Sequence, residues 1–177
     1  MRIYSLDNSK KNMKCSEYKK DKRTKNLTLR DIHVGDWVQV WSDITERYSP
    51  PLKIIQICDD GTIYLVGSDE ERPTPWEEDI KDIDALPIDG DLLRGFGFHK
   101  LSLSLELAHK MLIDSACEHE IFKLKNFPLY VDLVEHAAYK MQKDYCHKIY
   151  YNNFNDLQHN LFYWLPDINF EWKGVKK

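Results

Sequence analysis

The sequence predicts an α+β protein dominated by antiparallel β-structure, with a small-barrel-like N-terminal half and a second small sheet that carries a C-terminal amphipathic helix. Short runs of β-branched and aromatic residues, separated by turn residues, fill residues 31–67. Further strand-like runs recur between residues 98 and 151, and a helical period of apolar residues follows at 154–165. With 177 residues, of which 42% are hydrophobic, the chain has the length and composition of one folded domain.

The N-terminal half is predicted to open with a strand at residues 37–41, Trp-Val-Gln-Val-Trp. Side chains alternate along a strand, so the two tryptophans share one face and the two valines the other. A Ser-Pro-Pro sequence at 49–51 interrupts the ladder, and strands follow at 53–58 and 63–66. The Asp-Gly pair that ends at Gly61 predicts a hairpin there, because glycine tolerates the positive φ that tight hairpin turns need.

Residues 68–91 differ in composition from both flanks. Ten acidic residues stand there against Arg72 and Lys81, with three prolines between them. We predict an acidic, irregular connection that docks through a few apolar side chains. The Asp89-Gly90-Asp91 triplet is far shorter than a calcium-binding loop, so we expect no calcium or magnesium site in it.

The C-terminal half is predicted to begin with a short helix that ends at Gly95 or Gly97. Leucines alternate over residues 98–107, which favours a strand, although part of this stretch also fits a helical face. The conformation of residues 108–117 is left open between helix and loop. The remaining predicted strands are residues 121–125, 128–134 and 145–151.

The last predicted element is an amphipathic helix that follows Asn153 as its N-cap and stops at Pro166. Its apolar residues recur at helical spacing and define the face expected to be buried: Phe154, Leu157, Leu161, Phe162 and Leu165.

Charge divides the chain unevenly. Residues 1–30 carry ten Lys or Arg and three acidic residues, a net charge of +7, against −11 for the remainder. We interpret residues 1–26 as a basic arm, outside a single domain that spans 27–177 and comprises a barrel-like half (27–67), the acidic connector (68–91) and a sheet with a helix (92–177). The arm is a candidate for nucleic-acid contact through Lys10, Lys11, Lys14, Lys19, Lys20, Lys22, Arg23 and Lys25. The alternative is a solvated tail that aids solubility.

The four cysteines are widely spaced and form no CxxC motif, which indicates a reducing compartment. The first residues lack an apolar signal-peptide core, and no apolar run approaches the length of a membrane span. We therefore expect a cytoplasmic protein that does not bind membranes.

The common signatures of catalysis and of cofactor binding are absent, among them GxSxG, HExxH and the phosphate-binding GxxxxGK[ST] motif. Two groups carry metal-capable side chains, namely Asp114, Cys117, Glu118 and His119, and the pair Cys146 and His147. Their spacing matches no zinc finger, so the sequence predicts no catalytic, cofactor-binding or metal-ligating residues. A further open alternative concerns the aromatic residues of the first half, which are either a stacking platform or core: Trp37, Trp41, Tyr48 and Tyr64.

Three segments carry a resemblance to a known family: Val-Gly-Asp-Trp-Val at 34–38, Pro-Ile…Gly-Phe-Gly-Phe at 87–98, and Asp-Leu-Gln-His-Asn-Leu-Phe-Tyr-Trp-Leu at 156–165. They resemble the GDWV, PI…GF and LQNLY-like motifs of a family of small uncharacterised Bacteroidetes proteins found among prophage and mobile-element genes. The Leu-Thr pair of the second motif is missing, and Pro-Asp-Ile-Asn-Phe at 166–170 replaces the family's Thr-Gly-x-Glu-Leu ending. The resemblance covers about residues 27–170. It implies a β-rich layout and a mobile-element origin but no site, since the family has no assigned activity.

The function expected from the sequence is that of an intracellular, non-catalytic binding or accessory protein, whose partner is a protein or a nucleic acid. Two alternatives remain: an enzyme with an unrecognised active site, and a weak, non-specific nucleic-acid binder that acts through the basic arm. A deep pocket with converging His, Cys and carboxylate side chains would favour an enzyme, and a shallow surface patch would favour a binder.

Overall fold

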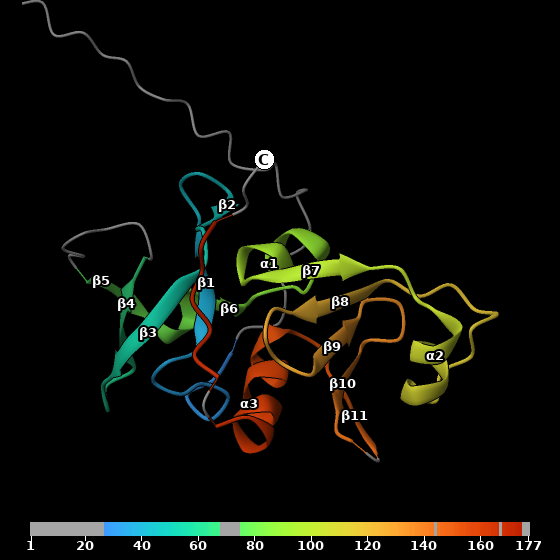
Figure 1. Ribbon diagram of the computed structural model, residues 1–177. Helices are drawn as coiled ribbons and strands as arrows, with labels where there is room; N and C mark the ends of the chain where they lie inside the picture. The colour runs from blue at the N-terminus through green and yellow to red at the C-terminus, as the bar shows by residue number, and fades with distance from the viewer. Residues whose placement is uncertain (1–26, 68–74, 144, 167, 175–177) are drawn as a thin grey trace, which may run out of the picture.

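The computed structural model describes residues 27–67, 75–143, 145–166 and 168–174. The chain folds into two antiparallel sheets with few helices (Figure 1), which confirms the predicted α+β class and the predominance of antiparallel strands. The first sheet is a curled half-barrel, and the C-terminal helix packs beside the second sheet.

The first sheet has the strand order β2-β1-β3-β4-β5, and β6 pairs with the remaining edge of β1. The turn between β3 and β4 contains Gly61 with a φ of +92°, as the hairpin prediction requires. The elements of this sheet are β1 (Trp37–Ser42), β2 (Arg47–Tyr48), β3 (Leu52–Ile57), β4 (Thr62–Val66), β5 (Trp76–Asp79), the short 3-10 helix η1 (Ile80–Asp82) and β6 (Ile83–Ala85).

The second sheet is a meander with the order β11-β10-β9-β8-β7. Helices α1 and α3 cover one of its faces, and α2 lies against the other. Its elements and helices are α1 (Gly90–Gly95), β7 (Phe98–Leu101), α2 (Leu105–Met111), β8 (Ile121–Leu124), β9 (Leu129–Asp132), β10 (Ala137–Met141), β11 (Cys146–Tyr150) and α3 (Phe154–Trp164).

Strand β1 contributes to two separate cores. Val38 and Val40 point into the half-barrel and pack with Ile54, Ile63 and other aliphatic residues. Trp37 points the opposite way, into the core between the second sheet, α1 and α3. Because side chains alternate along a strand, one short segment is buried on both faces and joins the two halves of the molecule.

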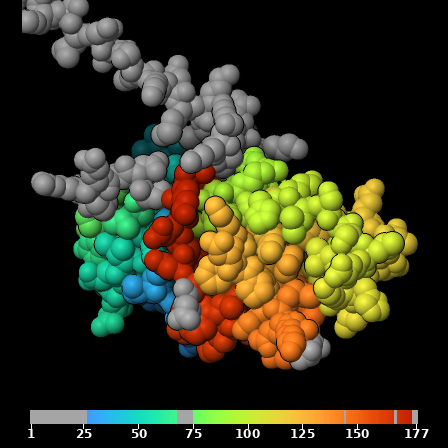
Figure 2. Space-filling view, in the orientation of Figure 1, coloured from blue at the N-terminus to red at the C-terminus, as the bar shows by residue number. Residues whose placement is uncertain are grey.

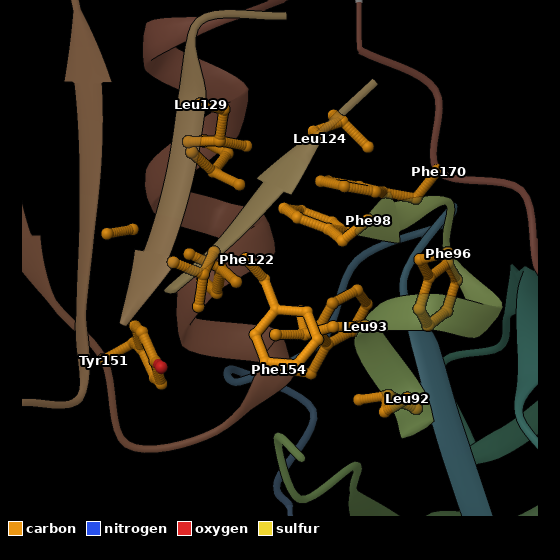
Figure 3. Packing of buried hydrophobic residues seen from close by; sticks show 14 of the residues in the cluster. Leu92, Leu93, Phe96, Phe98, Phe122, Leu124, Leu129, Tyr151, Phe154 and Phe170 are labelled. Atoms are coloured by element: carbon orange, nitrogen blue, oxygen red, sulfur yellow. The ribbon is translucent and has the colours of Figure 1, made fainter. Parts of the chain in front are cut away.

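The larger core is rich in aromatic rings. Phe96 stacks on Phe154 at 4.5 Å between ring centroids and meets Trp37 edge to face at 5.4 Å. Figure 3 shows Phe96, Phe98 and Phe154 converging between α1 and the strands, with Phe170 closing one side. Such ring pairs add about 0.5–1.5 kcal/mol each beyond the apolar area that they bury.

The C-terminal segment at 168–174 runs along the surface between the two halves (red in Figure 2). The Trp37 indole donates a hydrogen bond to the Phe170 carbonyl at 2.8 Å, and the Lys173 amide donates to the Gly95 carbonyl. This segment is therefore tied to β1 on one side and to α1 on the other.

Several sequence predictions differ from the structure. Residues 75–91 of the predicted irregular connector contain β5, η1 and β6, while residues 68–74 lie outside the described residues. Carboxylate side chains are poor strand formers, but those of β5 are exposed or half-buried at an edge of the sheet, and the pairing of β5 with β4 and of β6 with β1 completes the half-barrel. The strand predicted at 98–107 ends at Leu101, because Ser104 caps helix α2 by accepting a hydrogen bond from the Leu107 amide.

Strand β10 was not predicted, since its two alanines disfavour extended structure. It nevertheless lies between β9 and β11, where Ala137, Ala138 and Tyr139 are fully buried. The end helix is confirmed, with Asn153 capping the Asp156 amide, but Phe162 was wrongly placed on the buried face and is 68% exposed. In the described part of the chain, no helix has the length and apolar character needed to cross a membrane.

Truncating Leu161 to alanine should lower the free energy of unfolding by about 2–5 kcal/mol, because this side chain is 1% exposed and its removal leaves a cavity in the larger core. Chemical denaturation measures the change. The neighbouring Phe162→Ala is the matched control and should change stability by no more than about 0.5 kcal/mol. Equal effects of the two substitutions would contradict the placement of α3.

Candidate metal centre

A tight turn brings His33 and Asp36 together immediately before β1. The Asp36 amide donates to the His33 carbonyl at 3.1 Å, and Gly35 within the turn has a φ of +101°, which glycine adopts without strain. The Asp36 carboxylate accepts the His33 amide at 2.7 Å. The turn is held on the first sheet because the Gly35 amide donates to the Ile54 carbonyl and the Ile54 amide donates to the Asp36 carbonyl.

Helix α3 places a second histidine against this turn. Gln158, one residue earlier, accepts a hydrogen bond from the Trp37 amide at 3.1 Å and fixes the helix to the start of β1. His159 then lies over the turn, more than 120 residues away along the sequence from the two side chains it meets. Figure 1 shows the chain before β1 (blue) lying beside α3.

Three potential metal ligands converge at this place. The His159 Nε2 atom lies 2.7 Å from Asp36 Oδ2 and 2.9 Å from His33 Nδ1, and the third separation, from His33 Nδ1 to Asp36 Oδ2, is 3.9 Å. Among the described residues, these three form the group of at least three His, Cys, Asp or Glu side chains whose ligand atoms all lie within 4.8 Å of one another.

The three side chains differ in burial. The Asp36 side chain is 8% exposed, that of His159 is 29% exposed and that of His33 is 67% exposed. The site is therefore anchored on a buried carboxylate and open to solvent on the His33 side. The hydrogen bond to Asp36 raises the pKa of His159, against the effect of its burial, and the charges of Asp36, Asp156 and Asp31 add to the rise.

Proton bonding alone satisfies this arrangement poorly. A hydrogen on His159 Nε2 can be donated to Asp36 or shared with His33 Nδ1, but it cannot make two well-aligned bonds. A hydrogen on His33 Nδ1 directed at His159 instead leaves a nitrogen lone pair facing the carboxylate. A cation in the middle is attracted by all three lone pairs at once.

The distances suit a transition metal ion. Metal–ligand bonds of about 2.0–2.1 Å at tetrahedral angles place ligand atoms about 3.3 Å apart. The observed separations of 2.7, 2.9 and 3.9 Å lie on both sides of that value, and the His33 side chain is mostly exposed. Two imidazoles and one carboxylate suit zinc and the other late divalent metals better than magnesium or calcium, which prefer oxygen ligands.

This site is not evident from the sequence, because its members are far apart and match no motif. The signal that was available is the pair His33 and Asp36 on either side of a Val-Gly turn, directly before the Trp37 strand. Nothing local indicates that His159 joins them.

The two groups that the sequence did single out do not converge as metal sites. Cys146 packs among the residues around α2, whereas the adjacent His147 contacts Trp164 near the end of α3, since neighbouring residues of a strand face opposite ways. Cys117 is exposed and donates weakly to Asp114. Both ring nitrogens of His119 are engaged in protein hydrogen bonds.

His119 and Asp132 form a buried ion pair at the end of β9. The His119 Nδ1 atom lies 2.5 Å from Asp132 Oδ2, and its Nε2 atom lies 2.9 Å from the Asp114 carbonyl oxygen. The Asp114 carbonyl and an ionised Asp132 carboxylate both only accept, so a ring that bonds to both donates from each nitrogen and carries a positive charge. Burial lowers the pKa of His119, but the hydrogen bonds to Asp132 and Asp114, with the charges of Asp132 and Glu135, outweigh it and raise the pKa overall.

The aromatic side chains of the first half divide between core and surface. Trp37 is 3% exposed and belongs to the core. Trp41 and Tyr48 are half-buried and contact each other, and Tyr64 lies within 3.4 Å of Glu77. The basic residues proposed for nucleic-acid contact, at positions 10–25, lie outside the described residues, so that role stays a prediction.

Comparison with known proteins adds no function. No protein-family model matches the chain, and neither a curated protein nor a solved structure matches it. The resemblance to the Bacteroidetes family therefore stays a prediction, and a functional proposal must come from the geometry of the site.

Stability should depend on pH through His119. Its pKa is raised on folding, so its contribution is complete below about pH 6.5, the value of the unfolded chain, and is lost as pH rises through the folded-state pKa. Denaturant titrations between pH 6 and pH 9 measure this loss. His119→Gln, which cannot carry the charge, should show a flatter pH dependence, and an unchanged dependence would contradict a charged His119.

Proposed function

We propose that this chain is a non-catalytic binding protein and that its ligand at the His33–Asp36–His159 site is a divalent transition metal ion of the zinc class. The observation that supports this is that three potential ligand atoms lie within 4.8 Å of one another, and that one of them belongs to the buried carboxylate of Asp36. Solvated ion pairs on a surface lack this convergence, and the described charged residues elsewhere are mostly exposed pairs such as Lys110 with Glu106.

The ion would join parts of the chain that are distant in sequence. His33 and Asp36 belong to the turn that leads into the half-barrel, whereas His159 belongs to the helix on the second sheet. An unfolded chain does not hold these groups together, so the ion binds the native state preferentially and stabilises it. The proposed role of the metal is therefore to fasten the two halves to each other.

A catalytic role is the second candidate, because three protein ligands leave one position of a tetrahedral ion for water. Catalytic zinc sites have this arrangement, whereas structural sites are closed by four protein ligands. The exposed side at His33 would let water reach such an ion. A zinc-dependent hydrolysis of an activated ester, lost in His159→Ala, would favour the enzyme over the binder.

The metal-stripped full chain should bind one zinc ion, as measured by isothermal titration calorimetry or by competition with a chromophoric chelator. His33→Ala should weaken binding by about 100-fold or more, since loss of second-shell partners alone costs 10–100-fold. At a free zinc concentration of 100 times Kd, the folded state should gain about 2.7 kcal/mol.

Two controls make the result decisive. His33 is mostly exposed, so its removal should not unfold the chain, and His99→Ala removes an exposed histidine of β7, a strand that contributes no residue to the site. His99→Ala should bind zinc like the unaltered chain. Equal zinc affinity in His33→Ala, or no saturable binding in the unaltered chain, would contradict the proposal.

A further inference from the structure

The second sheet carries a row of basic and aromatic side chains on the face against which α2 packs. Helix α2 covers Ile121 and Ala137, which are fully buried. The adjacent row on this face crosses all five strands through residues that are partners in the pairing register: His99, Lys123, Tyr130, Tyr139 and Lys148. Partners on neighbouring strands point to the same side of a sheet, so these side chains lie in one line. All except Tyr139 are exposed or half-buried, so a ligand can reach the row.

Lysine side chains lie over the tyrosine rings of this face. The Lys123 ammonium is 5.6 Å from the Tyr130 ring centroid, and the Lys148 ammonium is 5.4 Å from that of Tyr139. Lys148 is also 4.8 Å from the ring centroid of Tyr150, which lies two residues further along β11 on the same face and is 67% exposed. The surface therefore presents aromatic rings with a positive charge beside them.

These strands are a positive part of an acidic chain. Residues 121–150 carry five lysines and three acidic residues, whereas the whole chain has a net charge of −4. Of the three acidic residues, Asp132 is fully buried against His119, Glu135 pairs with Lys148 at 2.6 Å, and Asp144 lies outside the described residues. Little exposed negative charge therefore opposes the lysines of this segment.

Two of these lysines are available to an anion. Lys123 is half-buried in β8, and Lys125 is exposed in the turn that follows. Within the described part of the chain, no carboxylate lies within ion-pair distance of either ammonium group. A lysine ammonium sits on a flexible stem, so the Lys123 charge can move from the Tyr130 ring to a phosphate when a ligand takes its place.

From the rings and the lysines together, we propose that this face of the second sheet, around Lys123, Tyr130 and Tyr150, binds single-stranded nucleic acid. Unpaired bases stack on aromatic side chains while basic side chains hold the phosphates, and a four-stranded sheet accommodates two or three bases in this way. Strands in a sheet are about 4.8 Å apart, so β8 and β11 are separated by about 14 Å, enough for a short run of nucleotides.

Other anionic ligands use only part of this surface. A duplex keeps its bases stacked inside and offers the rings nothing, and an acidic peptide offers charge without bases. The surface is distinct from the His33–Asp36–His159 site and from the basic residues at positions 10–25, so the proposal depends neither on metal binding nor on the N-terminal residues.

The test is fluorescence anisotropy of the full chain with a fluorescein-labelled oligouridylate of about 12 nucleotides, its oligothymidylate counterpart, and a duplex of the same length. We expect saturable binding of at least one single strand, and binding of the duplex that is at least about fivefold weaker. With about three phosphates contacted, affinity should fall about 10- to 20-fold between 50 and 200 mM salt. A preference for the oligouridylate would show that the 2′-hydroxyl groups are contacted.

Variants separate the contributions of rings and charges. Tyr150→Leu should weaken binding of the single strand by about fivefold or more, because it removes an exposed stacking ring. The double variant Lys123→Gln with Lys125→Gln should weaken it by a similar factor and should make the salt dependence shallower.

Matched controls remove the same kinds of side chain elsewhere. Tyr163→Leu removes a ring that is 84% exposed on α3, and Lys53→Gln removes one positive charge from β3 in the first sheet. Both should bind like the unaltered chain, and denaturant titration checks that every variant is folded. Unchanged affinity in Tyr150→Leu and in the double lysine variant, which would assign the binding to the N-terminal residues, would overturn the proposal. Equal binding of the duplex, equally strong competition by polyglutamate, or no saturable binding would also overturn it.

Discussion

The arrangement of the molecule depends on the burial of β1 on both faces. Val38 and Val40 complete the half-barrel, while Trp37 enters the aromatic core, where its indole holds the Phe170 carbonyl and its amide holds Gln158. If one face of β1 were exposed to solvent, this strand would contribute to one core and would not connect the two sheets. Here the C-terminal segment and α3 both accept a hydrogen bond from the same residue, Trp37.

The candidate metal centre is a consequence of that junction. The turn before β1 and helix α3 approach each other because Trp37 and Gln158 fix them, and the His33, Asp36 and His159 side chains then fall on the same side. Closing a loop of more than 120 residues costs chain entropy that grows only slowly with length. Core packing compensates for this loss of entropy when the chain folds, so the ion would bind a site that is largely preformed.

The sequence predicted the parts of the fold that depend on residues adjacent to one another in the chain. Gly61, the alternation of Trp37 with Val38 and Val40, and the cap at Asn153 each determine their own turn, strand or helix start, and all three are confirmed. Strand β10 and the strands within the acidic segment were missed, because tertiary pairing there overrides residue preference. The metal centre was missed for a different reason, since the approach of His159 to Asp36 is decided by helix packing and has no local signal.

We propose that His33, Asp36 and His159 hold one metal ion at the junction of the two halves. A crystal structure of the full chain grown with zinc, with anomalous diffraction data recorded on both sides of the zinc absorption edge, tests this proposal. We expect one strong anomalous peak within about 2.0–2.2 Å of His33 Nδ1, His159 Nε2 and an Asp36 carboxylate oxygen. A map without a peak there, with His159 bonded to Asp36 and His33 turned into solvent, would contradict it.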